Sequence, residues 1–308
     1  MSENSNYPKM TPFGAKYVEP ESTSKRVRSL GLSGIRNYGK LTSSFRLLPD
    51  YLIIGTKRGG TTSLARWLTQ HPEISSLFPK RETRKGTYYF DVNYSKGMNW
   101  YKSFFPTKVS HELKEKRSGH KLLLGDATPY YLYHPHAPKR ASRVIPNAKV
   151  IALLRNPIER AFSHWVERSR QGVETLPFDE AIDLEKTRLE GETQKMLEDP
   201  GYTSFPHQHY SYIDQGKYSQ CLQRWMDVYP QHQILFLKSE DLYSEPKETY
   251  QQVLDFLEIS EHEPKEFSAW NMKKKPELDP KVRKKLSTEF EEDIEKVESI
   301  LQRKMNWL

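Results

Sequence analysis

Residues 51 to 71 read YLIIGTKRGGTTSLARWLTQH, and this stretch decides the fold class. It begins with an apolar run of strand length at 51–54, which is followed by a glycine-rich turn at 55–60. After the turn, Thr61 or Thr62 is expected to N-cap a helix. The apolar face of that helix is Leu64, Trp67 and Leu68. A strand, a glycine-rich turn and a helix N-terminus form an anion site, because backbone N–H groups and the helix dipole both favour negative charge there.

The turn is similar to the nucleotide-binding P-loop, G-x-x-x-x-G-K-[ST], without matching it. Gly55 and Gly60 have the required spacing, and Thr62 stands at the Ser/Thr position. Thr61 stands where the P-loop has its lysine, and a lysine is present within the turn instead, at Lys57. The turn is therefore expected to hold a phosphate-like group and to reach it from another side.

These residues resemble the 5′-phosphosulfate loop of sulfotransferases that use PAPS (3′-phosphoadenosine 5′-phosphosulfate). The resemblance implies that Lys57 is catalytic, contacting the oxygen between sulfur and phosphorus and neutralising the leaving phosphate. It implies a 5′-phosphosulfate site made of Lys57, Arg58, Gly59, Gly60, Thr61, Thr62 and Ser63. Sulfuryl transfer is an in-line displacement in which, by analogy with phosphoryl transfer, the enzyme mainly positions the reactants and stabilises charge.

A second motif, KVIALLRNPIERAFS at 149–163, has the same strand–loop–helix form. Asn156 is a suitable N-cap and Pro157 a suitable first residue for its helix. The resemblance implies that Arg155 and Ser163 hold the 3′-phosphate that distinguishes PAPS from ATP, through charge-assisted hydrogen bonding. Arg160 is expected to be structural.

The general base is where the chain departs from the heparan-sulfate-type branch of the family, which residues 75–106 otherwise resemble. That branch has a catalytic glutamate at the position that Gly86 occupies here. Glu82 is one candidate, because its Arg-Glu-Thr-Arg segment resembles that of tyrosylprotein sulfotransferases, although a solvated ion pair is an equal alternative. Asp126 is the other candidate, at the carboxyl end of a predicted strand. It is equally expected to orient other groups or to cap a turn.

A lysine-rich segment at 271–280, NMKKKPELDP, resembles the loop that closes over the cofactor in heparan-type enzymes. Lys273 and Lys275 are the candidates there, with a solvated run of charge as the alternative. Acceptor-shaping segments are expected near 75–110 and 166–215.

Composition sets the remaining expectations. The chain has 308 residues, a formal net charge of +8 and one cysteine, so an anionic ligand is expected and an internal disulfide framework is excluded. No nucleic-acid motif, metal-ligand spacing or membrane-length apolar run is present. A basic polar arm at 1–48 and a single domain at 49–308 are predicted. The protein is expected to be cytoplasmic, with no metal, no nucleic-acid partner and no transmembrane segment.

The fold class follows from these signals as α/β. The resemblance implies a P-loop-like sulfotransferase fold, with a central parallel sheet of about five strands and helices on both faces. It implies sulfuryl transfer from PAPS to a hydroxyl or amine of a carbohydrate or small natural product, releasing PAP. The alternatives are an ATP-dependent kinase or NTPase of P-loop type, and a non-catalytic module that binds PAP or a polyanion. The oligomeric state is not predicted.

Overall fold

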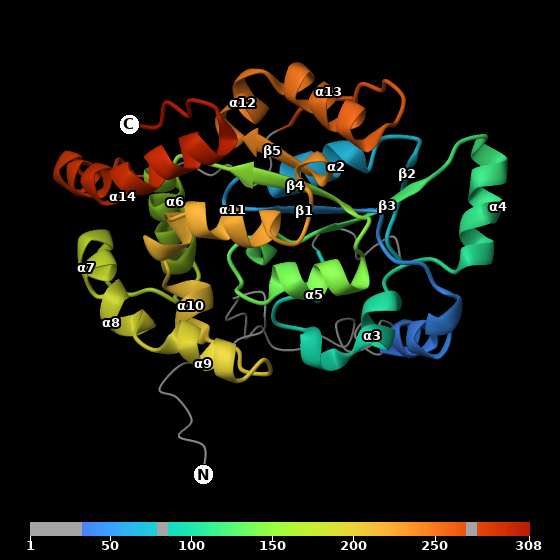
Figure 1. Ribbon diagram of the computed structural model, residues 1–308, viewed down its shortest axis with the longest axis horizontal. Coiled ribbons are helices and arrows are strands. Elements are labelled where there is room, and N and C mark those ends of the chain that lie inside the picture. The colour runs from blue at the N-terminus through green and yellow to red at the C-terminus, as the bar shows by residue number, and fades with distance from the viewer. Residues whose placement is uncertain (1–32, 79–85, 269–275) are drawn as a thin grey trace, which may run out of the picture.

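The computed structural model describes residues 33–78, 86–268 and 276–308. Its centre is a five-stranded sheet with the order β2-β3-β1-β4-β5, in which all pairs are parallel. The strands are Tyr51–Gly55 (β1), Ile74–Ser75 (β2), Leu123–Ala127 (β3), Lys149–Leu154 (β4) and Ile234–Lys238 (β5). Helices lie above and below this sheet in Figure 1. The predicted α/β fold, with a parallel sheet of about five strands and helices on both faces, is confirmed.

The two central strands are apolar because both of their faces are covered, as is usual in parallel sheets. β1 is buried along its whole length, and β4 is buried except at its first residue. Leu52 and Ile54 face one core cluster, whereas Tyr51 and Ile53 face the other. Alternation along β1 therefore divides the interior into two layers.

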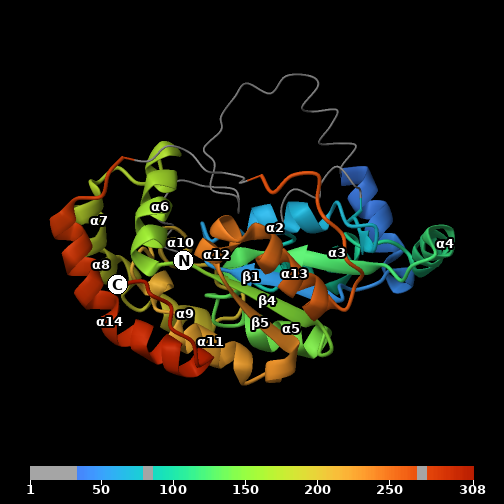
Figure 2. The same ribbon diagram turned by 90° about the horizontal axis from the view of Figure 1, so that it is seen from above.

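One layer contains α2 (Thr61–Leu68), α12 (Ser239–Ser244) and α13 (Pro246–Leu257). Figure 2 shows these three helices together over the sheet. The predicted apolar face of α2 is confirmed, because Leu64, Trp67 and Leu68 are all fully buried. They pack with the inward side chains of α13.

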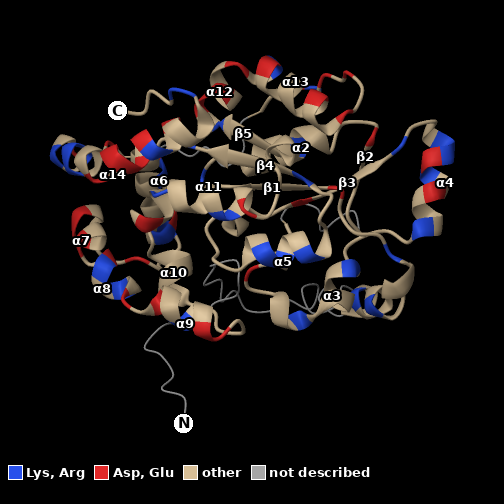
Figure 3. Cartoon of the chain, viewed as in Figure 1, with Lys and Arg blue, Asp and Glu red and all other residues tan. Residues whose placement is uncertain are grey.

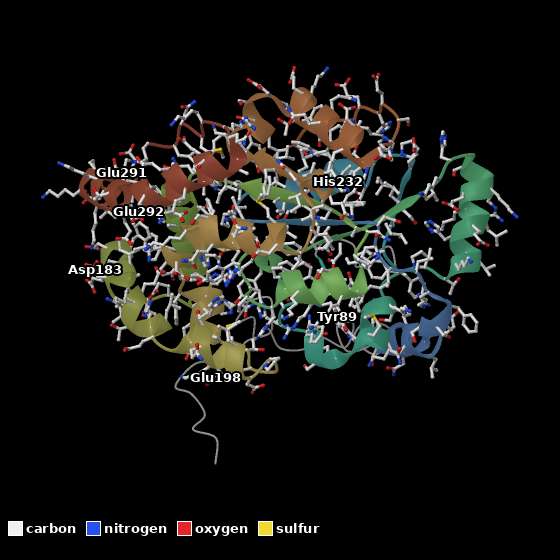
Figure 4. All side chains as sticks on the ribbon, in the orientation of Figure 1. Tyr89, Asp183, Glu198, His232, Glu291 and Glu292 are labelled. Atoms are coloured by element: carbon white, nitrogen blue, oxygen red, sulfur yellow. The ribbon has the colours of Figure 1, made fainter. Side chains whose placement is uncertain are left out.

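The other layer contains α5 (Ala137–Val144), α6 (Pro157–Arg170), α11 (Ser219–Met226) and α14 (Pro280–Leu301). Its side of the molecule also carries the shorter helices α7 (Phe178–Asp183), α8 (Glu185–Leu189), α9 (Glu192–Glu198) and α10 (Phe205–His209). Ion pairs such as Lys285–Asp183 join α14 to α7, where Figure 4 labels Asp183, Glu291 and Glu292. The paired helices α7 and α14 lie beyond the carboxyl end of β4 in Figure 1.

One end of the molecule is formed by α3 (Met98–Lys102), α4 (Lys108–Ser118) and the helical residues 33–41. Figures 1 and 2 both place α4 at the far end from α14. An isolated antiparallel bridge between Arg46 and Thr107 connects the chain after the helical residues 33–41 to the chain just before α4. Most of the predicted arm at 1–48 lies outside the described residues.

Candidate active site

The loop between β1 and α2 is built on a glycine that no other residue can replace. Gly55 has φ +146°, and a Cβ on it would lie 2.4 Å from the carbonyl oxygen of Leu153. The loop is held to β4 by a hydrogen bond of 2.9 Å from Thr56 N to Leu153 O. The side-chain oxygen of Thr56 is buried without a hydrogen-bond partner among the described residues. The loop therefore offers a polar interior next to the helix N-terminus.

The residue that caps α2 is Gly60, so the prediction of Thr61 or Thr62 as N-cap is wrong. Gly60 has φ +91°, and its carbonyl oxygen accepts the first helical hydrogen bonds, from Ser63 N and Leu64 N. The left-handed glycine turns the chain directly into the helix, one residue earlier than the sequence pattern indicates. Neither threonine hydroxyl caps the helix.

Lys57 points from this loop toward α10 and the residues that follow β3. Its ammonium donates a hydrogen bond to the carbonyl oxygen of Gln208 and lies 4.6 Å from the ring centroid of Tyr130. Burial, with Arg168 nearby, holds the pKa of Lys57 well below its usual value. A buried cation of this kind is stabilised by an anion, so the site favours a negatively charged ligand.

Arg155 and Ser163, the candidates for binding the 3′-phosphate, both contact the loop through Arg58. The guanidinium of Arg155 donates to the carbonyl oxygen of Arg58 at 2.8 Å, and the guanidinium of Arg58 donates to Ser163 Oγ at 3.2 Å. These contacts arise because β1 and β4 are neighbours in the sheet and both end at the same edge. The structure thus brings together Lys57, Arg58, Arg155 and Ser163, which lie in two separate motifs of the sequence.

The start of α6 is fixed as the sequence predicts. The side chain of Asn156 accepts from Ile158 N and Glu159 N, and Pro157 is the first helical residue. The same side chain donates to the carbonyl oxygen of Trp307 at 2.6 Å. Glu240 accepts both from Asn156 N at 2.9 Å and from the indole nitrogen of Trp307 at 3.2 Å. A ring of three residues therefore holds the N-terminus of α6.

Arg160 is structural, as predicted. Its side chain is fully buried, and its guanidinium donates to Gln215 and to the carbonyl oxygen of Tyr212. It therefore ties α6 to the segment before α11.

Asp126 lies at the carboxyl end of β3, where it was predicted, and both of its oxygens are occupied. Oδ1 accepts from Thr87 N at 2.9 Å and from Thr128 Oγ1 at 3.0 Å. Oδ2 accepts from Thr87 Oγ1 at 2.6 Å and from Tyr131 at 3.0 Å. This geometry favours the orienting role, because the carboxylate holds residues 87–90 against β3.

The position at which the heparan-type template has its glutamate is closed to any side chain. A Cβ on Gly86 would lie 2.1 Å from the carbonyl oxygen of Ala127 and 2.1 Å from Thr128 Oγ1. Residue 86 is therefore packed directly on the backbone that follows β3. A base in this protein must come from another position.

Asp91 is a buried carboxyl that sequence reasoning did not select. Oδ1 accepts from Val92 N at 2.5 Å, whereas Oδ2 is buried and has no hydrogen-bond partner among the described residues. Burial raises the pKa of Asp91 to about 8, while the positive charges of Lys57 and Arg140 act to lower it. The available signal was its place directly after an aromatic pair, the first of which, Tyr89, stacks on Tyr101 of α3 and is labelled in Figure 4.

Neutral histidines complete the surroundings of Lys57. Burial lowers the pKa of His207 to about 3 and that of His209 to about 2. His207 shares a hydrogen bond of 2.7 Å with Tyr130, and His209 Nδ1 lies 2.8 Å from the guanidinium of Arg168. Both ring nitrogens of His164 are buried without a partner in the described part of the chain. His164 was not selected from the sequence either, because nothing local marks its burial.

Three predicted site residues, Glu82, Lys273 and Lys275, lie outside the described residues. Among residues 33–78, 86–268 and 276–308, no group of three His, Cys, Asp or Glu side chains is arranged to hold a metal ion. Over the same ranges, no helix combines the length and the apolar character needed to cross a bilayer.

Comparison with known proteins places this site in a family context. The family model described as "Sulfotransferase domain" matches residues 48–305. A crystal structure of a sulfotransferase from Alicyclobacillus acidocaldarius is similar, with a TM-score of 0.64 and 26% identity, over 85% of this chain and 99% of that chain. The match therefore includes both cofactor motifs.

Two curated relatives are similar over much of this chain. The membrane-associated sulfotransferase kil1 of Dictyostelium discoideum is 24% identical over 325 residues, covering 84% of this chain and 66% of that protein. The bifunctional heparan sulfate N-deacetylase/N-sulfotransferase 2 of Bos taurus is 30% identical over 214 residues, covering 69% of this chain and 22% of that protein. The chain thus spans just under two thirds of the first relative and less than a quarter of the second.

Proposed function

The chain belongs to the sulfotransferase domain family, and we propose that it transfers a sulfuryl group from PAPS to a hydroxyl or amine of an acceptor, releasing PAP. The observation that carries this proposal is the contact of Arg58 with Arg155 and Ser163. This contact joins the phosphosulfate loop to the 3′-phosphate motif in one site. An ATP-dependent kinase needs no second motif of this kind.

The residues present fit the donor. The loop carries a buried hydroxyl without a partner on Thr56, and Gly55 leaves no room for a side chain between the loop and β4. Backbone N–H groups at the start of α2 suit an anion. PAPS supplies the activated sulfuryl group, and the residues from Lys57 to Ser63 would hold its 5′-phosphosulfate end.

Each charged residue then has a distinct task. Lys57 supplies the positive charge that stabilises the leaving phosphate, and binding an anion beside it restores the protonated state that burial disfavours. Arg155 and Ser163 hold the 3′-phosphate and so select PAPS over ATP. Lys273 and Lys275, which lie outside the described residues, stay predictions for closing the cofactor site.

We assign the acceptor proton to Asp91. Asp126 has four donors within 3.0 Å, so its carboxylate serves to position residues 87–90. Asp91 has a buried oxygen without a partner and a pKa of about 8, which is near the value that suits a general base at neutral pH. Glu82, outside the described residues, remains the competing prediction.

The acceptor class is proposed from the relatives. The heparan sulfate enzyme of Bos taurus acts, by its name, on a carbohydrate. We therefore propose a carbohydrate hydroxyl or amine as the acceptor here, with a small natural product as the alternative. The cytoplasmic location expected from the sequence stays a prediction.

Thermal unfolding with PAP, and separately with ATP and Mg²⁺, tests the donor. PAP at a hundred times its Kd adds about 2.7 kcal/mol of stability. We expect this gain to vanish in Arg155→Ala and to persist in Arg117→Ala, a control on the exposed surface of α4. Stabilisation by ATP–Mg²⁺ and not by PAP overturns the proposal in favour of a kinase.

Turnover measurements separate the base candidates. We expect Asp91→Asn to retain the PAP-induced stabilisation while losing sulfuryl transfer to a glycan panel. Asp126→Asn should lose stability first, because residues 87–90 lose their anchor. If only Glu82→Gln abolishes transfer, the base is Glu82 and Asp91 is structural.

A further inference from the structure

The most exposed apolar side chains of the described residues gather at one end of the molecule. Leu41 is 84% exposed, Phe45 is 69% exposed and Val109 is 67% exposed, and no other large apolar side chain in the described ranges exceeds them. Tyr38 and Leu113 are also exposed, at 55% and 49%. Contiguous exposed apolar surface on a protein marks an interaction site.

These side chains come from two segments that lie side by side. Tyr38, Leu41 and Phe45 belong to residues 33–45, whereas Val109 and Leu113 lie on α4. The Arg46–Thr107 bridge and the shared lining of one cavity join the segments. Figures 1 and 2 both show them at the same end of the molecule. We call Tyr38, Leu41, Phe45, Val109 and Leu113, together with this cavity, which Tyr38 also lines, the α4 face.

The cavity of the α4 face has a mixed lining that contains two cationic side chains. Its volume is about 470 Å³, and its lining includes Arg46, Ser75, Thr107, Ser110 and Lys114. Ser75 is 8% exposed, and its buried hydroxyl has no hydrogen-bond partner among the described residues. A hydroxyl in this state indicates a ligand or water in the cavity.

Arg46 adds a buried cation to the same cavity. The side chain is 6% exposed and donates to Thr42 Oγ1 at 2.8 Å and to the carbonyl oxygen of Phe105 at 2.5 Å. Burial lowers its pKa, while Tyr38 acts to raise it. A guanidinium, an ammonium and several hydroxyls around one cavity form the donor set that suits a phosphate group.

This end of the molecule is also strongly basic. Residues 33–47 and 94–121 contain ten Lys and Arg residues and two Glu residues, which gives these two segments a net charge of +8. Figure 3 shows Lys and Arg around α3 and the adjacent N-terminal helix, and both signs of charge on α4. The exposed apolar side chains therefore lie on a surface with a net positive charge.

We propose that the α4 face docks on an anionic phospholipid surface, with its apolar side chains at the boundary of headgroups and acyl chains and a lipid phosphate at its cavity. Apolar side chains combined with cations are the pattern of interfacial membrane binding. A polyanionic glycan would be bound by the cations alone and would not use Leu41 or Phe45. The proposal concerns peripheral contact and is independent of the donor site.

Co-sedimentation of the full chain with vesicles tests the proposal. We expect binding to vesicles of phosphatidylcholine and phosphatidylserine, little binding to phosphatidylcholine alone, and weakening by salt. The double change Leu41→Ser and Phe45→Ser should lower the apparent affinity at least tenfold. Leu197→Ser on α9 is the matched control, because Leu197 is 50% exposed at another place, and should leave binding unchanged.

A charge reversal tests the cavity. Lys114→Glu should weaken vesicle binding about thirtyfold, since each cation at an anionic surface contributes about fivefold. Lys281→Glu, on the exposed start of α14, is the matched control. Unchanged thermal unfolding and an unchanged PAP response would show that the variants are folded.

Three results overturn the proposal. The first is vesicle binding that the Leu41 and Phe45 changes leave intact. The second is binding to heparin and not to vesicles, lost in Lys114→Glu but retained in the double serine variant, which would make the face a polyanion site. Competition by inorganic phosphate alone, without vesicle binding, would assign the cavity to a free anion and also contradicts the proposal.

Discussion

Replacing Gly86 by alanine should destabilise the protein strongly, although the change adds only one methyl group. The new Cβ would lie 2.1 Å from both the carbonyl oxygen of Ala127 and Thr128 Oγ1, so residue 86 must move away from the end of β3. Movement there pulls on Thr87, which donates to Asp126 at 2.9 Å and 2.6 Å. Overpacking costs about 1–3 kcal/mol, and one weakened hydrogen bond to a charged group costs about 1.5–3 kcal/mol.

The expected total is about 2.5–6 kcal/mol, which lowers Tm by about 4–9 °C for a chain of 308 residues, because the entropy of unfolding is about 2.1 cal/mol/K per residue. Urea or thermal unfolding measures it directly, with Gly34→Ala as the control, because a Cβ there meets nothing within 4 Å. Gly86→Glu should be at least as unstable and should gain no activity. A Gly86→Glu variant that is both stable and more active would refute the packing at this position and the assignment of the base elsewhere.

Three further predictions concern the site. The rate kcat/KM should rise with pH through about 8 as Asp91 loses its proton, and Asp91→Asn should lose about 10²-fold or more of kcat, measured by PAP release. The unfolded chain releases the Asp91 proton near pH 3.8, whereas the folded protein keeps it up to about pH 8. Over this interval the free energy of unfolding falls as pH rises. Asp91→Asn should therefore gain stability relative to the wild type between pH 6 and 9 in urea unfolding. Ser163→Ala should weaken PAP binding about tenfold in calorimetry while leaving ATP binding unchanged, because it removes one hydrogen bond to the 3′-phosphate.

The parts of the site that the sequence predicts are those encoded by local patterns. Glycines at 55 and 60 predict the loop after β1, and Asn156 with Pro157 predicts the start of α6, because each signal acts within a few residues. The order of the strands then brings Arg155 and Ser163 to the loop through Arg58. Even here the cap of α2 is Gly60 and not the predicted threonine, because the left-handed conformation of Gly60 is a property of the folded turn.

The parts that could not be predicted depend on contacts between distant segments. Asp91 is buried by the aromatic side chains around it and by Arg140, which donates to the carbonyl oxygens of Phe90 and Asp91 from 49 or 50 positions away. The sequence around Asp126 does not indicate that its carboxylate is hydrogen-bonded, because its donor Thr87 is 39 positions away and contacts it only in the folded protein. Nothing near either residue in the sequence reports these partners.

The ring of Asn156, Glu240 and Trp307 also has a consequence for the timing of biosynthesis. Asn156 fixes the N-terminus of α6, yet its partner Trp307 is translated 151 positions later. A nascent chain on the ribosome can form the loop after β1 and the whole of β4 long before this ring can close. The part of the site proposed to bind the 3′-phosphate is thus completed only after Trp307 has been made, so a stalled chain that stops before Trp307 should bind PAP poorly even when its sheet is formed.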